Sequence, residues 1–148
     1  MKFKVEEFMT QKVITIDAAK SIFDAAKVLS EERLGSIVVT KGERPVGILT
    51  DRDILTRAVA QKRKLEREIV ARIMSKPLVT VKPESSMFEV MKLMEKHSIR
   101  RVPVVKDGKI VGMVTQSDVE RAAVLLPRLG SGVQEIYLIK DSRKQTRQ

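Results

Sequence analysis

The sequence lacks cysteine and tryptophan altogether, and it contains one histidine and one tyrosine. Without cysteine the chain can form no disulfide, no thiolate nucleophile and no sulfur-ligated metal site. A single histidine also excludes a multi-histidine metal site, so we expect no bound metal. Aromatic residues make up only 3% of the chain, which leaves few of the stacking platforms that single-stranded nucleic acids need.

A long apolar run is missing as well. No stretch approaches the roughly 18–20 consecutive apolar residues of a membrane span, and the chain begins with charges where a signal peptide would be apolar. We therefore expect a cytoplasmic protein that does not associate with membranes. At 148 residues and 43% hydrophobic content the whole chain can bury a core, whereas either half alone would be marginal.

The net charge of +10 raises the question of nucleic-acid binding. Basic residues exceed acidic ones by four in residues 1–65, by four in residues 66–130 and by two in the tail, residues 131–148. This even distribution favours a surface that attracts anions in general, because a nucleic-acid footprint would concentrate the charge. A nucleic-acid-binding or scaffolding role for the basic surface is kept as the alternative hypothesis.

What the chain does contain is an internal repeat. Residues 5–65 align with residues 70–130 without a gap, and 15 of the 61 pairs are identical, where unrelated chains would share roughly 4. The identities gather where VGILTDRDI (46–54) meets VGMVTQSDV (111–119). Two copies of one unit predict an approximate two-fold axis, and function is best sought in the clefts between the copies.

Each copy shows the same order of elements: strand, helix, strand, strand, helix. The helices are expected at about 20–33, 51–63, 85–98 and 116–126. The strands are expected at about 13–16, 36–40, 46–50, 78–81, 101–105 and 111–115. Ser21 and Ser86 each precede an acidic residue by three positions, which predicts a capping box at the start of each first helix. In the tail, residues 133–140 predict an edge strand, and the basic end is expected to be disordered.

This order, the sequence IRRVPVV (99–105) before a hairpin and the pattern G-h-h-T-x-x-D (h, apolar) resemble a cystathionine-β-synthase (CBS) domain. Two in tandem resemble a Bateman module, and the resemblance covers about residues 5–130. It implies an α/β (α+β) fold with two β-α-β-β-α repeats, 5–65 and 70–130, about a pseudo-two-fold axis. Each repeat would have a small mixed sheet with helices on one face. Because no catalytic domain is attached, the chain resembles a stand-alone, non-enzymatic regulatory pair.

The repeated Thr-x-x-Asp, Thr50 with Asp53 and Thr115 with Asp118, has two interpretations. A threonine at a helix start with an aspartate three residues later is close to a capping box, which needs no ligand. Alternatively, the carboxylate can accept hydrogen bonds from the hydroxyls of a ribose while the helix N-terminus attracts a phosphate. In the family that the chain resembles, the same pair contacts ribose and phosphate. We therefore expect ligand contact in at least one copy, with the capping retained.

An enzymatic function is not expected. The carboxylates of Asp53 and Asp118 lie in different copies, no nucleophile–base pair is evident, and glycine-rich phosphate loops are absent from the sequence.

The resemblance also implies that each cleft takes its base-facing wall from one copy and its Thr/Asp pair from the other. The first cleft is expected to hold Thr10, Val13, Ile14, Leu34, Gly35, Arg100, Arg101, Met113, Thr115, Ser117 and Asp118. The second, weaker cleft is expected to hold Ser75, Leu78, Val79, Ile99 and again Arg100, with Ser36, Ile48, Thr50, Arg52 and Asp53. Adjacent arginines at a strand entrance are often only a solvated rim, but a similar His-Arg pair meets nucleotide phosphates in the resembled family. We expect the first cleft to bind more tightly, because Ser117 leaves room for phosphate where Arg52 could fill the space.

The ligand that the resemblance implies is an adenine nucleotide, AMP, ADP or ATP, acting as a regulatory ligand and not as a catalytic cofactor. S-adenosylmethionine and dinucleotides are also ligands of the resembled family, but a cationic sulfonium gains nothing from paired arginines. A ligand that bridges both copies would bias the angle between them and so signal to a partner protein. Unpartnered apolar side chains on the helices predict a homodimer, which this family forms as a flat disc. They are Leu55, Val59, Val124, Leu125 and Leu126.

Overall fold

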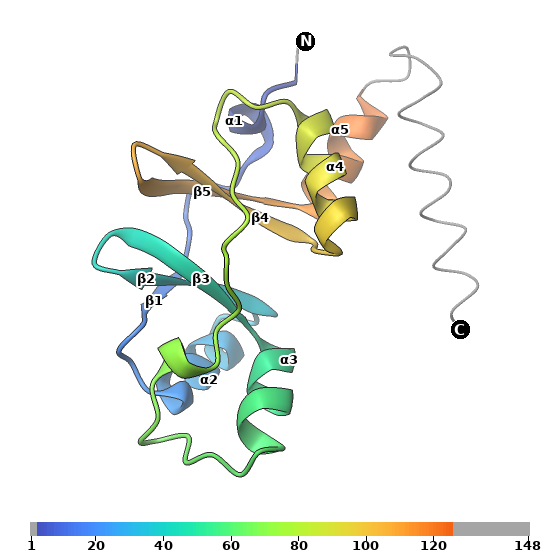
Figure 1. The fold of residues 1–148 in the computed structure, drawn as a ribbon. Helices are drawn as coiled ribbons and strands as arrows, with labels where there is room; N and C mark the ends of the chain where they lie inside the picture. Colours follow the sequence, from blue (N-terminus) through green and yellow to red (C-terminus); the bar gives the residue numbers. More distant parts are fainter. Residues whose placement is uncertain (1–2, 126–148) are drawn as a thin grey trace, which may run out of the picture.

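The computed structural model describes residues 3–125, and its elements follow the repeat (Figure 1). In the first copy they are β1 (Thr15–Asp17), α2 (Ile22–Glu31), β2 (Ser36–Lys41), β3 (Arg44–Thr50), α3 (Asp51–Asp53) and η1 (Ile54–Val59). In the second they are η2 (Val70–Arg72), α4 (Met87–His97), β4 (Arg101–Lys106), β5 (Lys109–Thr115) and α5 (Gln116–Val124). A four-residue helix, α1 (Val5–Phe8), begins the first copy, at the place that η2 has in the second. The predicted tail, with its edge strand at 133–140 and its disordered end, lies outside the described residues.

The two predicted amphipathic helices, α2 and α4, are confirmed. Each starts after a serine whose hydroxyl accepts a hydrogen bond from the backbone N–H three residues on: Ser21 from Asp24 at 3.0 Å and Ser86 from Glu89 at 3.1 Å. These caps fix where the helices begin, because they satisfy N–H groups that have no partner inside the helix. The apolar face of each helix is buried as its spacing predicts.

Each copy folds its strands into a small sheet. In the first, β1 pairs parallel with β2, and β2 pairs antiparallel with β3. In the second, β4 and β5 form an antiparallel pair of matching register and carry a bulge at the equivalent place. The mixed sheet and the predicted order of elements are thus present in the first copy, and the second copy departs from them at one position.

The departure concerns residues 78–81, where the prediction of a continuous strand was wrong. Only Val81 pairs, by one parallel bridge to Val104, with its N–H donating to the Pro103 carbonyl at 3.0 Å. Pro103 occupies the place that Val38 has in the first copy, where β1 pairs along three residues. Because proline has no N–H, it cannot donate a further hydrogen bond to the chain beside it.

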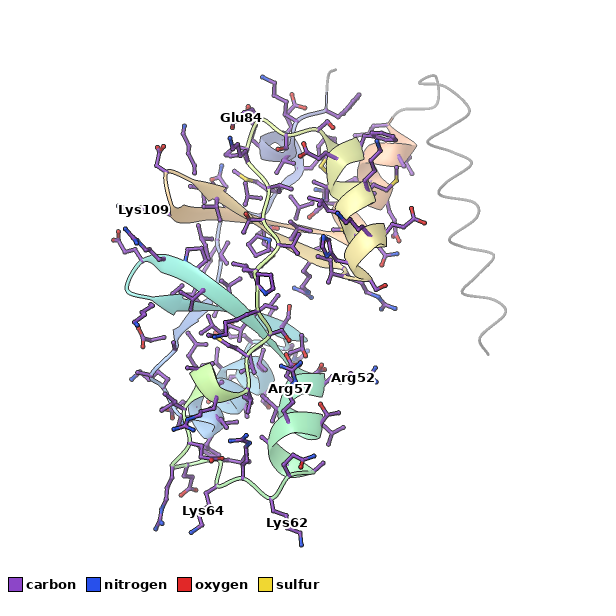
Figure 2. All side chains as sticks on the ribbon, viewed as in Figure 1. Arg52, Arg57, Lys62, Lys64, Glu84 and Lys109 are labelled. Carbon is purple, nitrogen blue, oxygen red and sulfur yellow. The ribbon has the colours of Figure 1, made fainter. Side chains whose placement is uncertain are left out.

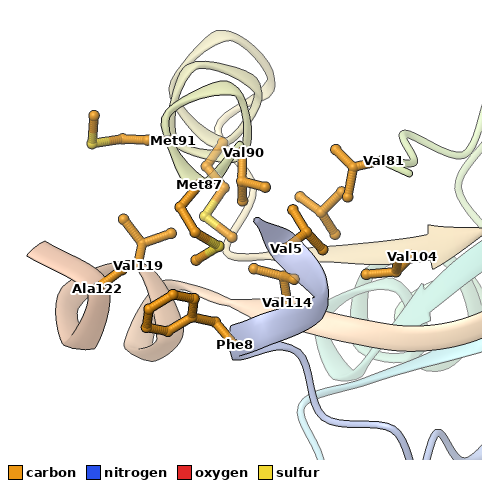
Figure 3. Packing of buried hydrophobic residues seen from close by; sticks show 12 residues of the cluster. Val5, Phe8, Val81, Met87, Val90, Met91, Val104, Val114, Val119 and Ala122 are labelled. Carbon is orange, nitrogen blue, oxygen red and sulfur yellow. The ribbon is translucent and has the colours of Figure 1, made fainter. Parts of the chain in front are cut away.

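The buried residues form two hydrophobic clusters, one in each copy, and each cluster includes residues from the other copy's leading segment. The cluster of the first copy contains Val70 and Ile73. The cluster of the second copy contains Val5 and Phe8, which Figure 3 shows against Val114. The first copy as the sequence defines it therefore does not complete its own core, and neither does the second.

We call these leading segments the crossover segments, residues 3–10 and residues 68–75. The first pairs with the second copy: the Val5 N–H donates to the Ser85 carbonyl at 2.8 Å, and Thr10 and Met113 exchange two backbone hydrogen bonds of 2.9 Å. The second pairs with the first copy in the same way. Its Ser75 donates to the Ile48 carbonyl at 2.8 Å and accepts from the Ile48 N–H at 3.1 Å.

Two glycines make room for these crossings. A Cβ added to Gly112 would lie 3.0 Å from the Thr10 carbonyl oxygen, and one added to Gly47 would lie 2.9 Å from the Ser75 carbonyl oxygen. Both neighbours are backbone atoms in paired chains and cannot move aside without breaking the pairing. This explains why glycine stands at the same place in both copies.

The two copies meet through their sheets, with β3 beside β5 and the helices on the outer sides (Figure 1). The turns of the two hairpins are joined by an ion pair of 2.9 Å between Glu43 and Lys109. Within residues 3–125 no helix is long and apolar enough to cross a membrane.

Candidate functional site

The two Thr-x-x-Asp turns lie at the ends of β3 and β5, where each strand passes directly into a helix. Thr50 Oγ1 accepts from the Asp53 N–H at 3.0 Å, and Asp53 Oδ2 accepts from the Thr50 N–H at 3.0 Å. The same reciprocal pair joins Thr115 and Asp118, at 3.4 and 2.8 Å. The capping interpretation is confirmed in both copies, and contact with a ligand stays a prediction.

Both carboxylates are buried, with Asp53 8% and Asp118 5% exposed. Asp118 Oδ2 also accepts from its own Thr115 hydroxyl at 3.1 Å. In the first copy the extra hydroxyl comes instead from Ser75, which lies 3.3 and 3.4 Å from the two oxygens of Asp53. The two carboxylates thus have the same cap and different hydroxyl partners.

Around Asp118 the structure gathers much of the predicted first cleft. Thr10 is paired with Met113, Arg101 stands opposite Thr115 in the β4–β5 ladder, and the Arg100 carbonyl accepts from the Gln116 N–H at 2.9 Å. Ser117 lies exposed in the turn itself. The predicted residues near Asp118 are therefore Thr10, Arg100, Arg101, Met113, Thr115 and Ser117.

The first-copy residues predicted for this cleft have other described contacts. Ile14 and Leu34 pack against the core of their own copy, and Val13 is half-buried. The Gly35 carbonyl accepts from the Asp51 N–H at 3.1 Å, which places Gly35 beside the turn of the other cleft. Their role toward a ligand at Asp118 stays a prediction.

Around Asp53 the structure gathers part of the predicted second cleft. Ser36 stands opposite Thr50 in the β2–β3 ladder, and Ser75 is paired with Ile48. Ser36 is buried, yet its hydroxyl has no hydrogen-bond partner among the described residues. A buried hydroxyl without a partner is costly, and a ligand atom or a water at this place would satisfy it.

For the remaining residues of the second cleft the structure gives only their exposure or their packing. Arg52 is exposed, and Figure 2 shows it pointing outward at the start of α3. Leu78 and Val79 are half-buried in the chain that leads to the second copy. Ile99 packs against the core of the second copy.

Two arginines that the sequence analysis did not single out contact the site carboxylates. Arg121 Nη2 lies 2.9 Å from Asp118 Oδ1, and Arg57 Nε lies 3.7 Å from Asp53 Oδ1. Their spacings of three and four residues from an aspartate on a helix are a signal that could have found them. The gap-free alignment hid the equivalence, because it places Arg121 opposite Thr56 and not opposite Arg57. Within residues 3–125, no three acidic or histidine side chains gather into a metal site.

Comparison with known proteins identifies the family to which the chain belongs. The sequence profile of the CBS domain matches residues 5–60 and 70–125. YlbB, an uncharacterized protein of Bacillus subtilis (strain 168), is 33% identical over 135 residues, which are 90% of this chain and 90% of YlbB.

Two solved structures extend the comparison. CBSX2 in complex with AMP has a TM-score of 0.73 at 26% identity, over 85% of this chain and 99% of CBSX2. A hexameric CBS-CP12 protein from bloom-forming cyanobacteria has a TM-score of 0.74 at 30% identity, over 98% of this chain and 87% of that protein. One relative in fold thus binds AMP, and another assembles into an oligomer.

Proposed function

Because the chain belongs to the CBS domain family as a tandem pair, a non-catalytic regulatory module, we propose that it binds an adenine nucleotide between its copies. AMP, ADP and ATP are the ligands proposed, with a change in the packing of the copies as the signal. The observation that carries the proposal is the buried Asp118 carboxylate, fixed at the N-terminus of α5 beside Arg100 and Arg101. AMP bound to CBSX2, a protein of similar fold, supports the choice of ligand.

The first cleft is proposed as the tighter site. The Asp118 carboxylate can accept from ribose hydroxyls, while the positive end of the helix dipole and the two guanidinium groups suit a phosphate. Ser117 is small and exposed, so it leaves room for that phosphate. S-adenosylmethionine ranks lower, since its sulfonium would meet positive charge at the same place.

The second cleft is proposed as the weaker site. Ser75 already donates toward both oxygens of Asp53, so a ribose has to replace that contact. The unpaired Ser36 hydroxyl supports a ligand here all the same, because a phosphate or ribose oxygen could satisfy it.

Isothermal titration with AMP, ATP and S-adenosylmethionine tests the proposal, on protein freed of co-purified nucleotide. Asp118→Asn removes the charged acceptor and is expected to weaken AMP binding by about tenfold or more, since a hydrogen bond to a charged group contributes about 1.5–3 kcal/mol. Asp24→Asn is the matched control, because Asp24 holds the same position after the cap of α2, away from the clefts. It should leave the affinity unchanged. The proposal fails if the wild-type protein releases no heat with any adenosyl ligand.

The alternative function is binding of nucleic acid by the basic surface, and one observation favours it. Lys62, Lys64 and Arg67 line an open hollow of about 560 Å³, and Figure 2 shows Lys62 and Lys64 pointing away from the body of the chain. Binding of this kind should fall steeply as salt rises and should survive Asp118→Asn. Nucleotide binding, in contrast, should be weakened by Asp118→Asn.

We also propose a cytoplasmic homodimer formed through the helices that follow β3 and β5. Four of the predicted apolar residues are exposed: Leu55 at 61%, Val59 at 50%, Val124 at 78% and Leu125 at 60%. The fifth, Leu126, lies outside the described residues. The hexamer of the CBS-CP12 protein supports assembly as a property of related pairs, and a regulated partner protein would read the packing of such a dimer.

A further inference from the structure

Arg121 joins the Asp118 carboxylate to the first crossover segment. Its Nη2 donates to Asp118 Oδ1 at 2.9 Å and to the Phe8 carbonyl at 3.1 Å, and its guanidinium carbon lies 5.9 Å from the centre of the Phe8 ring. Asp118 and Phe8 are 110 residues apart in the sequence and are both buried. One exposed side chain on α5 thus contacts the site carboxylate and the end of α1 together.

The first copy contains the same arrangement. Arg57 lies 3.7 Å from Asp53 and donates to the carbonyls of Ile73 and Met74 at 3.2 and 3.3 Å, at the end of η2 in the second crossover segment. Ile73 is the repeat equivalent of Phe8.

The two arginines reach equivalent places from non-equivalent positions in the alignment. Residues 54–59 form a π-helix, whose hydrogen bonds span five residues where those of an α-helix span four. The extra residue in this turn lets an arginine four residues after Asp53 stand where Arg121 stands three residues after Asp118. A contact that is kept despite a change of position is unlike an incidental surface ion pair.

The acceptor capacity of Asp118 shows why the arginine stays when a ligand binds. A carboxylate offers about four acceptor sites, and three described donors use them: the Thr115 N–H, the Thr115 hydroxyl and Arg121. A ribose with two hydroxyls needs two sites, so one donor has to yield. The Thr115 hydroxyl can rotate away and donate elsewhere, whereas Arg121 is held by the Phe8 carbonyl as well.

From this geometry we infer that Arg121 is a positioning residue that couples ligand binding at Asp118 to the docking of the first crossover segment. The inference rests on the proposed nucleotide site. A ligand that fixes the carboxylate also fixes Arg121, and through it α1. By reciprocity, a docked α1 favours binding of the ligand. Since α1 is covered by the second copy and leads directly to β1 of the first, the segment would carry the state of the cleft from one copy to the other.

Arg121→Gln tests the inference, with amide hydrogen exchange at residues 5–10 and the AMP dissociation constant as readouts. Without ligand, the variant is expected to exchange faster at residues 5–10 than the wild type. Saturating AMP should slow this exchange in the wild type and leave it unchanged in the variant. The variant should also bind AMP about tenfold more weakly.

Arg57→Gln is the matched control, since it removes the equivalent arginine of the other copy and should leave exchange at residues 5–10 unchanged. If Arg121→Gln does not fold, Arg121→Lys replaces it, because an ammonium lacks the planar fork that holds two acceptors. If AMP binds the wild type, but exchange at residues 5–10 responds equally in wild type and variant, the inference is overturned while the proposed function stands. If the wild type does not bind AMP, the proposed function itself has failed.

Discussion

At the residue scale, Thr115 and Asp118 combine a structural task with the proposed chemical one. Their reciprocal hydrogen bonds start α5, and the same bonds hold the carboxylate still at the helix N-terminus. A side chain that is already fixed loses little conformational freedom when a ligand binds. The capping role therefore supports the binding role, and the two can be separated by comparison with a cap that lies outside the clefts.

Thr115→Ala and Ser86→Ala make that comparison. Each removes the hydroxyl that caps a helix, α5 or α4, and each should lower the free energy of unfolding by about 1 kcal/mol. Only Thr115→Ala should also weaken AMP binding, because Ser86 caps α4 and is not among the residues of either predicted cleft. Urea unfolding and isothermal titration on the same samples measure both effects. Equal AMP affinity in the two variants would leave Thr115 with the capping role alone.

At the element scale, the crossover segments decide how the copies are joined. Val5, Phe8 and Met9 repeat as Val70, Ile73 and Met74, at helical spacing that predicts one buried turn in each case. These turns could have been predicted from the sequence. The copy against which each turn packs could not, because both copies offer nearly the same apolar surface and only the path of the chain distinguishes them.

Phe8→Ala tests whether the leading turn of the first copy packs against the second copy. Phe8 is 7% exposed and belongs to the cluster of the second copy, so truncation is expected to cost about 3 kcal/mol of unfolding free energy. Hydrogen exchange should accelerate in β4 and β5 before it does in β1 to β3, although Phe8 belongs to the first copy in the sequence. Phe23→Ala is the matched control, since Phe23 is 46% exposed on α2 and its loss should cost well under half as much. Faster exchange confined to the first copy would contradict the packing.

At the scale of the whole molecule, the repeat accounts for what could be predicted and its departures account for what could not. The helices, the two hairpins and the Thr-x-x-Asp turns follow from local spacing and capping, so two copies of one pattern predicted them. The missing strand at 78–81 depends on Pro103, and the placement of Arg57 depends on a π-helical turn. Both are effects of a single residue on strand pairing or helical register, and the periodicity of the sequence does not reveal them. The predicted clefts are an intermediate case, since the structure shows their Thr/Asp turns while the role of their base-facing residues stays a prediction.

Leu55→Glu and Val124→Glu test the proposed assembly of the whole molecule. Both side chains are more than half exposed on the helices that follow the clefts, and a carboxylate buried there on dimerisation would lack a partner. Sedimentation should give the wild type about twice the chain mass of 16.7 kDa and each variant a mass near 16.7 kDa. Phe23→Glu, on the exposed face of α2, should remain dimeric. AMP affinity should persist in the monomeric variants, because each proposed cleft is built within one chain. A wild type that sediments as a monomer would contradict the homodimer and would leave the nucleotide site as a property of the single chain.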